Sequence, residues 1–232
     1  MTLTAIVTGA GRGIGRETAF LFAKKGLNVA ICSRTLKEIQ DTANTIKKIN
    51  PGVIGVSCDV SIPSEVESFV GQTARKFGGI DILINNAGVA FVKSLLETTE
   101  AQWDETMGSN LKSAFLCSKF VLPRMIERNC GVIINVSSGA GRAGFANLSA
   151  YCASKFGMMG LTESLAWEVA HHNIRVMAIC PGEVATRMQE DTDPEYYKKN
   201  RASMIQPKAV AARICEMALD ARRYRNGESV DI

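Results

Sequence analysis

The sequence predicts an α/β protein built on one parallel β-sheet with helices on both faces. Short apolar segments of strand length alternate with helical patterns along the whole chain. The apolar segments carry few polar residues, as expected for strands that are buried on both faces. A chain of 232 residues suits a single domain, and it contains no linker, internal repeat or low-complexity segment. We therefore expect residues 1–232 to form one doubly wound domain.

The same patterns give the order of the elements. Strands are expected at residues 2–8, 27–33, 53–57, 81–85, 131–137 and 174–180. Helices are expected at residues 13–25, 35–49, 62–77, 101–127, 149–172 and 207–222. The segment 182–206 is long and polar, which is typical of a lid or a disordered loop. The chain ends at 229–232, within or just after a final strand.

Composition excludes several classes of function. A net charge of +4 suits an enzyme for anionic cofactors or substrates, but it is too small and too scattered to predict nucleic-acid binding. The longest run without an acidic or basic residue is 13 residues, short of the ~20 that a membrane span needs. No basic-then-apolar leader precedes the first strand. The 7 cysteines form no C-x-x-C pair and no metal-ligand cluster is present, so we expect a cytoplasmic protein without a metal.

Ser138, Tyr151 and Lys155 form a candidate catalytic group. Tyr151 and Lys155 are four residues apart in a predicted helix and therefore share one face. A phenol beside an ammonium group loses its proton more easily than at its usual pKa of ~10, because the positive charge favours the phenolate. Such a tyrosine transfers a proton to or from an alcohol near neutral pH. Ser138 follows a predicted buried strand, and its hydroxyl is suited to holding the same substrate oxygen.

A glycine-rich turn separates the first strand from the first helix. It has the pattern T-G-x-x-x-G-x-G, and glycines let the backbone approach a pyrophosphate closely. The helix that follows offers free N–H groups and the positive end of its dipole to the same group. The turn therefore predicts a dinucleotide site formed by Thr8, Gly9, Arg12, Gly13, Ile14 and Gly15.

These motifs, taken in order, identify the chain as similar to the short-chain dehydrogenase/reductase family. The resemblance runs from residue 2 to about residue 190. It rests on the glycine turn, Asp59-Val60, Asn85-Asn86-Ala87-Gly88, Asn110, Ser138, Tyr151-x-x-x-Lys155 and Pro181-Gly182-x-x-x-Thr186. The resemblance implies a Rossmann-type fold and a nicotinamide cofactor.

The residues after the second strand bear on the choice of cofactor. Many dinucleotide folds place an acid there, which accepts hydrogen bonds from the ribose 2′-hydroxyl of NAD. Here the strand ends in Ser33-Arg34, and no acid occurs before Glu38. Arg34 and Arg12 are suited to pairing with a 2′-phosphate, and Ser33 is suited to donating a hydroxyl. We therefore expect NADP(H) to be preferred over NAD(H), with solvated surface arginines as the alternative.

The family resemblance assigns the rest of the cofactor site. It implies that the Asp59 carboxylate and the Val60 N–H hold the adenine, although a helix cap is an alternative role for Asp59. It places Asn86, Ala87 and Gly88 beside the adenosine ribose. It also implies that the segment with Pro181, Gly182 and Thr186 holds the nicotinamide carboxamide.

The resemblance also assigns the catalytic roles. Tyr151 protonates the carbonyl oxygen, Ser138 polarises the carbonyl, and Lys155 holds the nicotinamide ribose and lowers the tyrosine pKa. Asn110 matches a fourth catalytic residue, which kinks a helix and holds a water next to the lysine; an ordinary polar helix residue is the alternative. Ser137 adjoins Ser138 and is its rival, and the spacing to Tyr151 favours Ser138 by resemblance.

The pattern most resembles bacterial 3-oxoacyl-acyl-carrier-protein reductases, which act in fatty acid metabolism. This favours an NADPH-dependent reduction of a 3-oxoacyl thioester, carried on acyl carrier protein or coenzyme A. A general carbonyl, sugar or polyol dehydrogenase and a non-catalytic NADP-binding regulator are the alternatives. The resemblance further implies a homo-oligomer, in which helices 101–127 and 149–172 pack as a dimeric four-helix bundle and two dimers form a homotetramer. Relatives usually continue past the final strand with a glycine-rich tail, so we expect the interface between the two dimers to differ in this chain.

Overall fold

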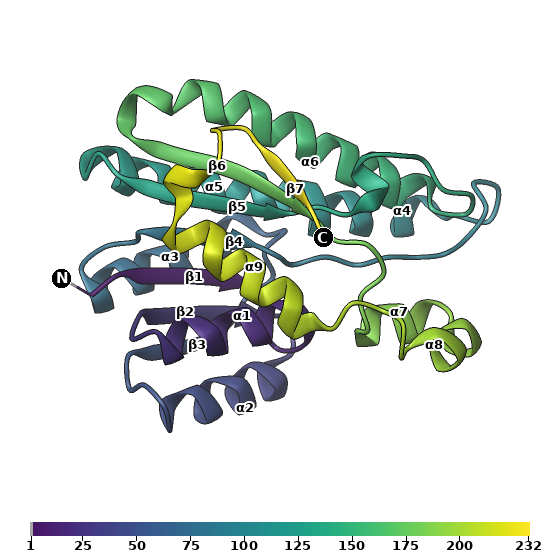
Figure 1. The fold of residues 1–232 in the computed structure, drawn as a ribbon, viewed down its shortest axis with the longest axis horizontal. Helices are drawn as coiled ribbons and strands as arrows, with labels where there is room; N and C mark the ends of the chain where they lie inside the picture. The colour runs from purple at the N-terminus through teal and green to yellow at the C-terminus, as the bar shows by residue number, and fades with distance from the viewer. Residues whose placement is uncertain (1) are drawn as a thin grey trace.

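The computed structural model describes residues 2–232 and contains one seven-stranded parallel sheet (Figure 1). The strands follow the order β3-β2-β1-β4-β5-β6-β7. Every neighbouring pair is parallel. The strands are β1 Thr4–Thr8, β2 Asn28–Ser33, β3 Val53–Ser57, β4 Ile82–Asn85, β5 Gly131–Val136, β6 Ile174–Cys180 and β7 Ser229–Asp231. The predicted fold class is therefore confirmed.

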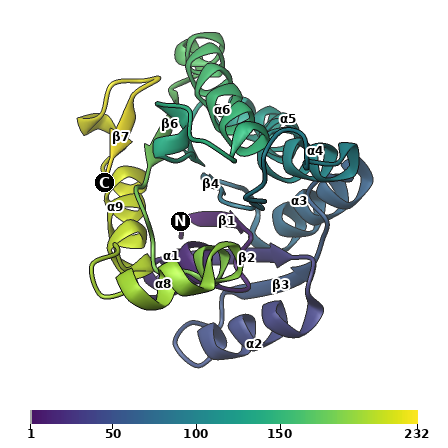
Figure 2. The same cartoon turned by 90° about the vertical axis from the view of Figure 1, so that its right-hand side faces the viewer.

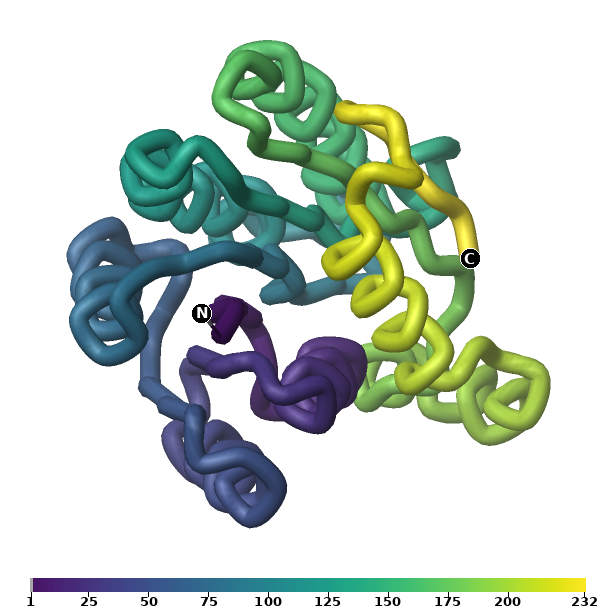
Figure 3. The backbone as a smooth tube through the Cα atoms, turned by 60° about the vertical axis from the view of Figure 1, so that its left-hand side comes forward, coloured from purple at the N-terminus to yellow at the C-terminus, as the bar shows by residue number. Residues whose placement is uncertain are grey.

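Helices cover both faces of the sheet, as the apolar strands require. One face carries α1 Gly13–Lys24, α2 Leu36–Lys47 and α9 Pro207–Leu219, with Phe22 at the centre of the core. The other carries α3 Pro63–Phe77, α5 Ser113–Glu127 and α6 Ser149–Glu168, with Phe69 buried in the core on that side. The tube view shows α9 alongside α1, although they come from opposite ends of the chain (Figure 3).

The strand order places the functional edge of the sheet. From β1 the chain steps outward to β2 and β3, and α3 then carries it back to β4 on the other side of β1. Because the loops after β1 and β4 then run in opposite directions, they leave a crevice at the carboxyl ends of the strands. Figure 2 looks toward that edge and shows α8 (Pro194–Asn200) in front of it.

The predicted helix 101–127 is interrupted in the structure. It consists of α4 (Glu100–Met107), a five-residue π-helix (Gly108–Lys112) and α5. The Asn110 side chain lies in the widened turn, where it binds the backbone of Val89. A π-turn of this kind often marks a functional position, and apolar spacing does not reveal it.

The segment 182–206 is folded, so the expectation of a disordered loop is wrong, while a lid stays a prediction. It contains α7 (Arg187–Thr192) and α8, which project beyond the sheet. Thr186 caps α7, and Asp193 caps α8 by accepting from the Tyr196 N–H. Pro194 then occupies the first turn of α8. The remaining predicted elements agree with the structure to within a few residues at their ends.

The last residues form the edge strand of the sheet next to β6. β7 pairs with β6, and Gly182 N–H donates to the carbonyl of Ile232 at 2.9 Å. Arg142 pairs with Asp231 at 3.1 Å and also donates to the Ser229 carbonyl. The final strand is thereby fixed to the loop that follows β5. Within residues 2–232 no helix is both long enough and apolar enough to cross a membrane.

Candidate active site

The turn between β1 and α1 has room only for glycine at two positions. Gly9 has a φ of 63°, and a Cβ there would lie 2.8 Å from the Cα of Ala87. A Cβ on Gly15 would lie 2.6 Å from the Gly9 carbonyl oxygen and would also strike the Asn86 amide. Both glycines therefore let the turn close against the end of β4.

Thr8 and Asn86 hold that turn in place. The Thr8 hydroxyl accepts from the N–H groups of Asn86 at 3.0 Å and Ala87 at 3.1 Å. In return the Asn86 amide donates to the carbonyls of Thr8 at 2.9 Å and Gly9 at 3.2 Å. Thr8 and Gly15 do not line the cavity, whereas Gly9, Gly13 and Ile14 do. The side chains of Thr8 and Asn86 thus fix the dinucleotide turn against the end of β4.

The start of α1 is suited to an anion. Arg12 precedes the helix in an extended conformation, and no side chain caps the first turn. The N–H groups of that turn are therefore open to a ligand, at the positive end of the helix dipole. The backbone cradle and these donors together fit the pyrophosphate of a dinucleotide.

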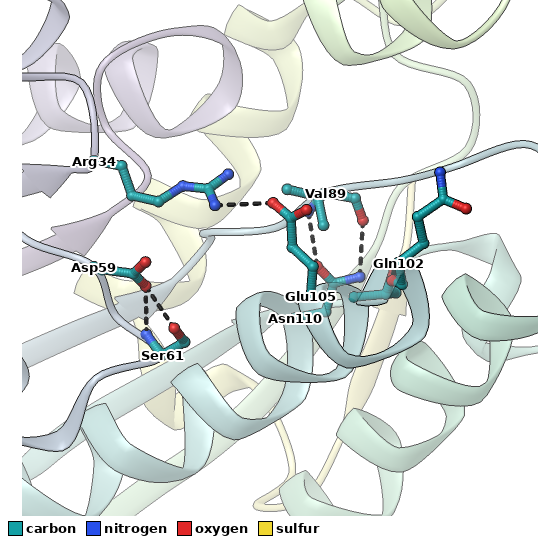
Figure 4. A network of polar contacts seen from close by, with 8 residues as sticks. Arg34, Asp59, Ser61, Val89, Gln102, Glu105 and Asn110 are labelled. Carbon is teal, nitrogen blue, oxygen red and sulfur yellow. Dashed lines mark hydrogen bonds and ion pairs between the residues drawn. The ribbon is translucent and has the colours of Figure 1, made fainter. Parts of the chain in front are cut away.

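Two arginines and a serine meet at the far end of the cavity, as the sequence predicted, but each arginine has an acidic partner. Arg34 donates to Glu105 of α4 at 2.9 Å (Figure 4). Arg12 lies 3.7 Å from Glu38 of α2. Glu38 lines the cavity together with Ser33, whereas Glu105 does not. Neither glutamate was predicted to take part in the site.

Asp59 and Val60 line the cavity between this end and the centre. Asp59 lies beyond the end of β3 and accepts from the Ser61 N–H at 2.9 Å and the Ser61 hydroxyl at 2.7 Å (Figure 4). Both bonds reach the same carboxylate oxygen. The side chain thus stabilises the turn before α3 without capping the helix itself, whose first residue follows Ile62.

Ser138, Tyr151 and Lys155 all line the cavity. Lys155 is buried at 4% exposure, and its Nζ donates to the Val136 carbonyl at 2.8 Å. Burial lowers the pKa of Lys155 to about 8. The Ser137 hydroxyl donates to the Lys155 carbonyl at 3.3 Å, which leaves Ser138 as the serine beside Tyr151.

The pKa of Tyr151 differs from the sequence-based expectation. Burial raises it above the ordinary value, and a hydrogen bond with the Ser138 side chain opposes that rise. The Lys155 ammonium lies 5.5 Å from the centre of the tyrosine ring. The expected lowering by the lysine is therefore wrong, because desolvation dominates. Tyr151 is protonated at neutral pH.

Asn110 is fully buried behind the cavity and does not line it. Its amide accepts from the Val89 N–H at 2.8 Å and donates to the Val89 carbonyl at 3.0 Å (Figure 4). It also donates to the Ser154 hydroxyl at 3.0 Å, on the helix that carries Tyr151 and Lys155. Asn110 therefore connects the π-helix, the loop after β4 and α6.

The cavity lined by Ser138, Tyr151 and Lys155 has a volume of about 590 Å³. Asn86, Ala87 and Gly88 line it from the end of β4, and Pro181, Gly182 and Thr186 line it from the end of β6. Sequence reasoning did not identify several further lining residues, which are Glu38, Val92, Phe145, Leu148, Glu183, Met188 and Tyr196. Of these, Tyr196 of α8 donates to the Glu183 carboxylate at 3.0 Å and so ties the projecting helices to the base of the cavity.

The sequence profile of short chain dehydrogenases matches residues 3–196. The chain belongs to the short-chain dehydrogenase family. It is 33% identical to 3-oxoacyl-[acyl-carrier-protein] reductase of Staphylococcus aureus, over 100% of this chain and 97% of that one. It is 38% identical to D-beta-hydroxybutyrate dehydrogenase of Rhizobium meliloti, over 84% of this chain and 76% of that one.

Solved structures agree with this assignment. Actinorhodin polyketide ketoreductase, solved with NADPH, superposes with a TM-score of 0.93 at 29% identity, and the match covers 100% of this chain and 95% of that one. This short-chain dehydrogenase is therefore an NAD(P)-dependent oxidoreductase with a Rossmann-type fold. The expected family and enzyme class are confirmed.

Proposed function

We propose that the protein reduces a carbonyl to a secondary alcohol with NADPH, and that the carbonyl belongs to a 3-oxoacyl thioester. The observation that carries the proposal is the grouping of Ser138, Tyr151 and Lys155 along one wall of the dinucleotide cavity. When bound, the nicotinamide supplies the hydride. The protein's own residues supply the proton and hold the substrate oxygen.

Each of the three side chains has a defined task in this proposal. The Ser138 hydroxyl donates to the carbonyl oxygen and orients it toward Tyr151. Tyr151 then gives its proton to that oxygen as general acid. Its raised pKa suits reduction, because the phenol is protonated at neutral pH. Lys155 holds the ribose of the cofactor and attracts the developing phenolate, and Asn110 positions α6 through Ser154.

The substrate class is supported by the relatives and by the lining of the cavity. A 3-oxoacyl thioester and β-hydroxybutyrate both carry their reacting oxygen at the third carbon. Val92, Phe145, Leu148 and Met188 give the cavity that contains Tyr151 an apolar part, which suits an acyl chain. A general carbonyl, sugar or polyol dehydrogenase would use the same catalytic residues.

The preference for NADPH is proposed from the two arginines. Arg12 and Arg34 both line the cavity beside Ser33. Charge-assisted hydrogen bonds contribute about 1.5–3 kcal/mol each, so we expect NADPH to bind at least about tenfold more tightly than NADH. Fluorescence titration of both cofactors measures this, and Arg34→Ala should narrow the difference. Equal affinities in the unmodified protein would contradict the preference.

A substrate panel tests the reaction itself. The purified full chain is mixed with NADPH and acetoacetyl-CoA, free acetoacetate, simple ketones or sugars, and cofactor oxidation is followed by absorbance. We expect the thioester to give the highest kcat/KM. Higher kcat/KM with a ketone or sugar would favour the general dehydrogenase. Cofactor binding without turnover of any member would instead favour a non-catalytic regulator.

A further inference from the structure

Glu38 occupies an unexpected place in the dinucleotide cavity. Its carboxylate reaches back from α2 toward the glycine turn, so that Oε2 lies 3.0 Å from the position a Cβ on Gly11 would take. The Ser33 hydroxyl lies 3.1 Å from that same position. Oε1 lies 3.7 Å from the Arg12 guanidinium. The carboxylate and the hydroxyl therefore meet at one point beside Gly11, and the Arg12 cation lies next to the carboxylate.

That point is the end of the cavity where the two arginines predict a 2′-phosphate. A carboxylate there has two opposite effects on a ligand. It accepts a hydrogen bond from a ribose 2′-hydroxyl, and it repels a 2′-phosphate. It also neutralises part of the charge of Arg12, which lowers what that arginine offers to an anion. The sequence placed no acid at the end of β2, but the fold brings one to the same place from a helix.

We infer that Glu38 is a specificity-determining residue of the cofactor site, where it favours NADH and opposes NADPH. The inference rests on the proposed function only in that the ligand is a nicotinamide dinucleotide. It concerns binding at the adenosine end and does not depend on which carbonyl is reduced. Glu38 thus limits the preference for NADPH that Arg12 and Arg34 produce.

Glu105 provides a matched comparison. It also pairs with an arginine of the site, Arg34, at 2.9 Å (Figure 4). Unlike Glu38, it does not line the cavity, so it has no access to a ribose hydroxyl. Removing its charge frees an arginine without removing a hydrogen-bond acceptor from the ligand. The two glutamates therefore differ in what they do to NADH.

The test measures dissociation constants by fluorescence or calorimetry for the unmodified chain, Glu38→Gln and Glu105→Gln. We expect Glu38→Gln to bind NADPH about tenfold more tightly and NADH several-fold more weakly, and tenfold corresponds to about 1.4 kcal/mol. Glu105→Gln should tighten NADPH binding less and leave NADH unchanged. Asp41→Asn, one turn further along α2 and exposed, should change neither.

Fragments of the cofactor isolate the adenosine end. Adenosine 2′,5′-bisphosphate should gain affinity in Glu38→Gln, whereas 5′-AMP should lose it. A NADPH-to-NADH affinity ratio in Glu38→Gln equal to that of the unmodified chain would overturn the inference, and Glu38 would then be only a surface partner of Arg12. These experiments measure binding and not turnover. A failure of the thioester proposal in the turnover assay would therefore not change the conclusion about Glu38.

Discussion

Burial destabilises the charged form of Lys155. Its pKa is about 8, well below the ordinary value, because 4% exposure leaves the ammonium little water. Below that pH the lysine is charged in both the folded and the unfolded chain, and the folded chain bears the whole cost of desolvation. As pH rises from about 8 toward 10.4, the folded lysine loses its proton before the unfolded one, so this group's contribution to stability increases.

Lys155→Met should therefore stabilise the protein while removing its activity. A depression of about 2.5 pKa units corresponds to about 3 kcal/mol, and the lost bond to the Val136 carbonyl offsets part of it. We expect a gain of about 1–3 kcal/mol in the free energy of unfolding near pH 7, shrinking toward about pH 10. Urea denaturation at both values measures it. Lys47→Met, on an exposed position, serves as control; equal effects of the two substitutions would contradict this account.

The same pKa predicts how the reaction depends on pH. Carbonyl reduction should slow as pH rises through about 8, because Lys155 loses the charge that attracts the tyrosinate. Tyr151 does not set this limit, since its pKa is raised and the phenol keeps its proton there. Initial rates at saturating cofactor between about pH 6 and 10 give the profile. A rate that stays constant across that range would show that the lysine charge is not needed.

Tyr151→Phe removes only the hydroxyl that donates the proton. We expect kcat for reduction to fall by about 10²–10⁴, the usual contribution of a general acid. Cofactor affinity and thermal stability should stay near those of the unmodified chain, because the ring and its packing are kept. Turnover within a few-fold of the unmodified chain would remove Tyr151 from the mechanism.

Sequence reasoning identified residues by motif, and it missed those that only the fold brings together. Every motif residue lines the cavity except Thr8, Gly15, Asn85 and Asn110. Glu105 is 71 positions from Arg34, and no local pattern connects them. The direction of the Tyr151 pKa shift was also wrong, because spacing reveals a neighbouring lysine but not the loss of water around both groups.

At the scale of elements, the glycine turn after β1 can be tested against another turn of similar backbone. Gly9 and Gly26 both have positive φ, at 63° and 83°. A Cβ on Gly9 would strike Ala87, whereas a Cβ on Gly26 meets nothing within 4 Å. Gly26→Ala should therefore lower the free energy of unfolding only by the cost of a left-handed backbone conformation for alanine, about 1–2 kcal/mol. Gly9→Ala should cost more, and it should also weaken dinucleotide binding by displacing the end of β4.

Thermal melts and NADPH titrations of the two variants separate the backbone cost from the steric one. Gly26→Ala should bind NADPH as the unmodified chain does. Equal loss of stability and unchanged binding in both variants would mean that the close approach of Gly9 and Ala87 has no role in the site.

Elements with a strong apolar period were predicted well, and irregular ones were not. Buried strands and amphipathic helices carry their own signal. The π-helix at Gly108–Lys112 depends on a distant backbone partner, Val89, so the spacing of apolar residues in the segment 101–127 continues through it. The short helices α7 and α8 are polar and depend on the caps at Thr186 and Asp193. Asp193-Pro194 is a helix-start signal for α8, but the polar segment after it is too short to predict a helix.

At the scale of the whole molecule, the outer faces of α5 and α6 carry exposed aromatic side chains. Several apolar residues of these helices are buried within the chain, among them Ala114, Cys117, Val121, Met158, Met159 and Leu165. Phe115, Phe156 and Trp167 are 46%, 47% and 82% exposed. The surface available for a bundle thus excludes these buried residues, but it contains three large aromatic side chains. Exposed aromatic residues are typical of interfaces.

Trp167→Asp should convert an assembled protein into a monomer. A buried aromatic anchor typically contributes 2 kcal/mol or more at an interface, and a carboxylate in an apolar contact adds a desolvation cost, so we expect dimer affinity to fall by about 100-fold or more. Light scattering at micromolar concentration should report a dimer or tetramer for the unmodified chain and a monomer for Trp167→Asp. Leu36→Asp, which changes a 52% exposed residue on α2 on the opposite face of the sheet, should keep the assembly. Circular dichroism checks that both variants are folded. If the unmodified chain is itself a monomer, or if Trp167→Asp assembles as before, the helices 101–127 and 149–172 do not form the interface.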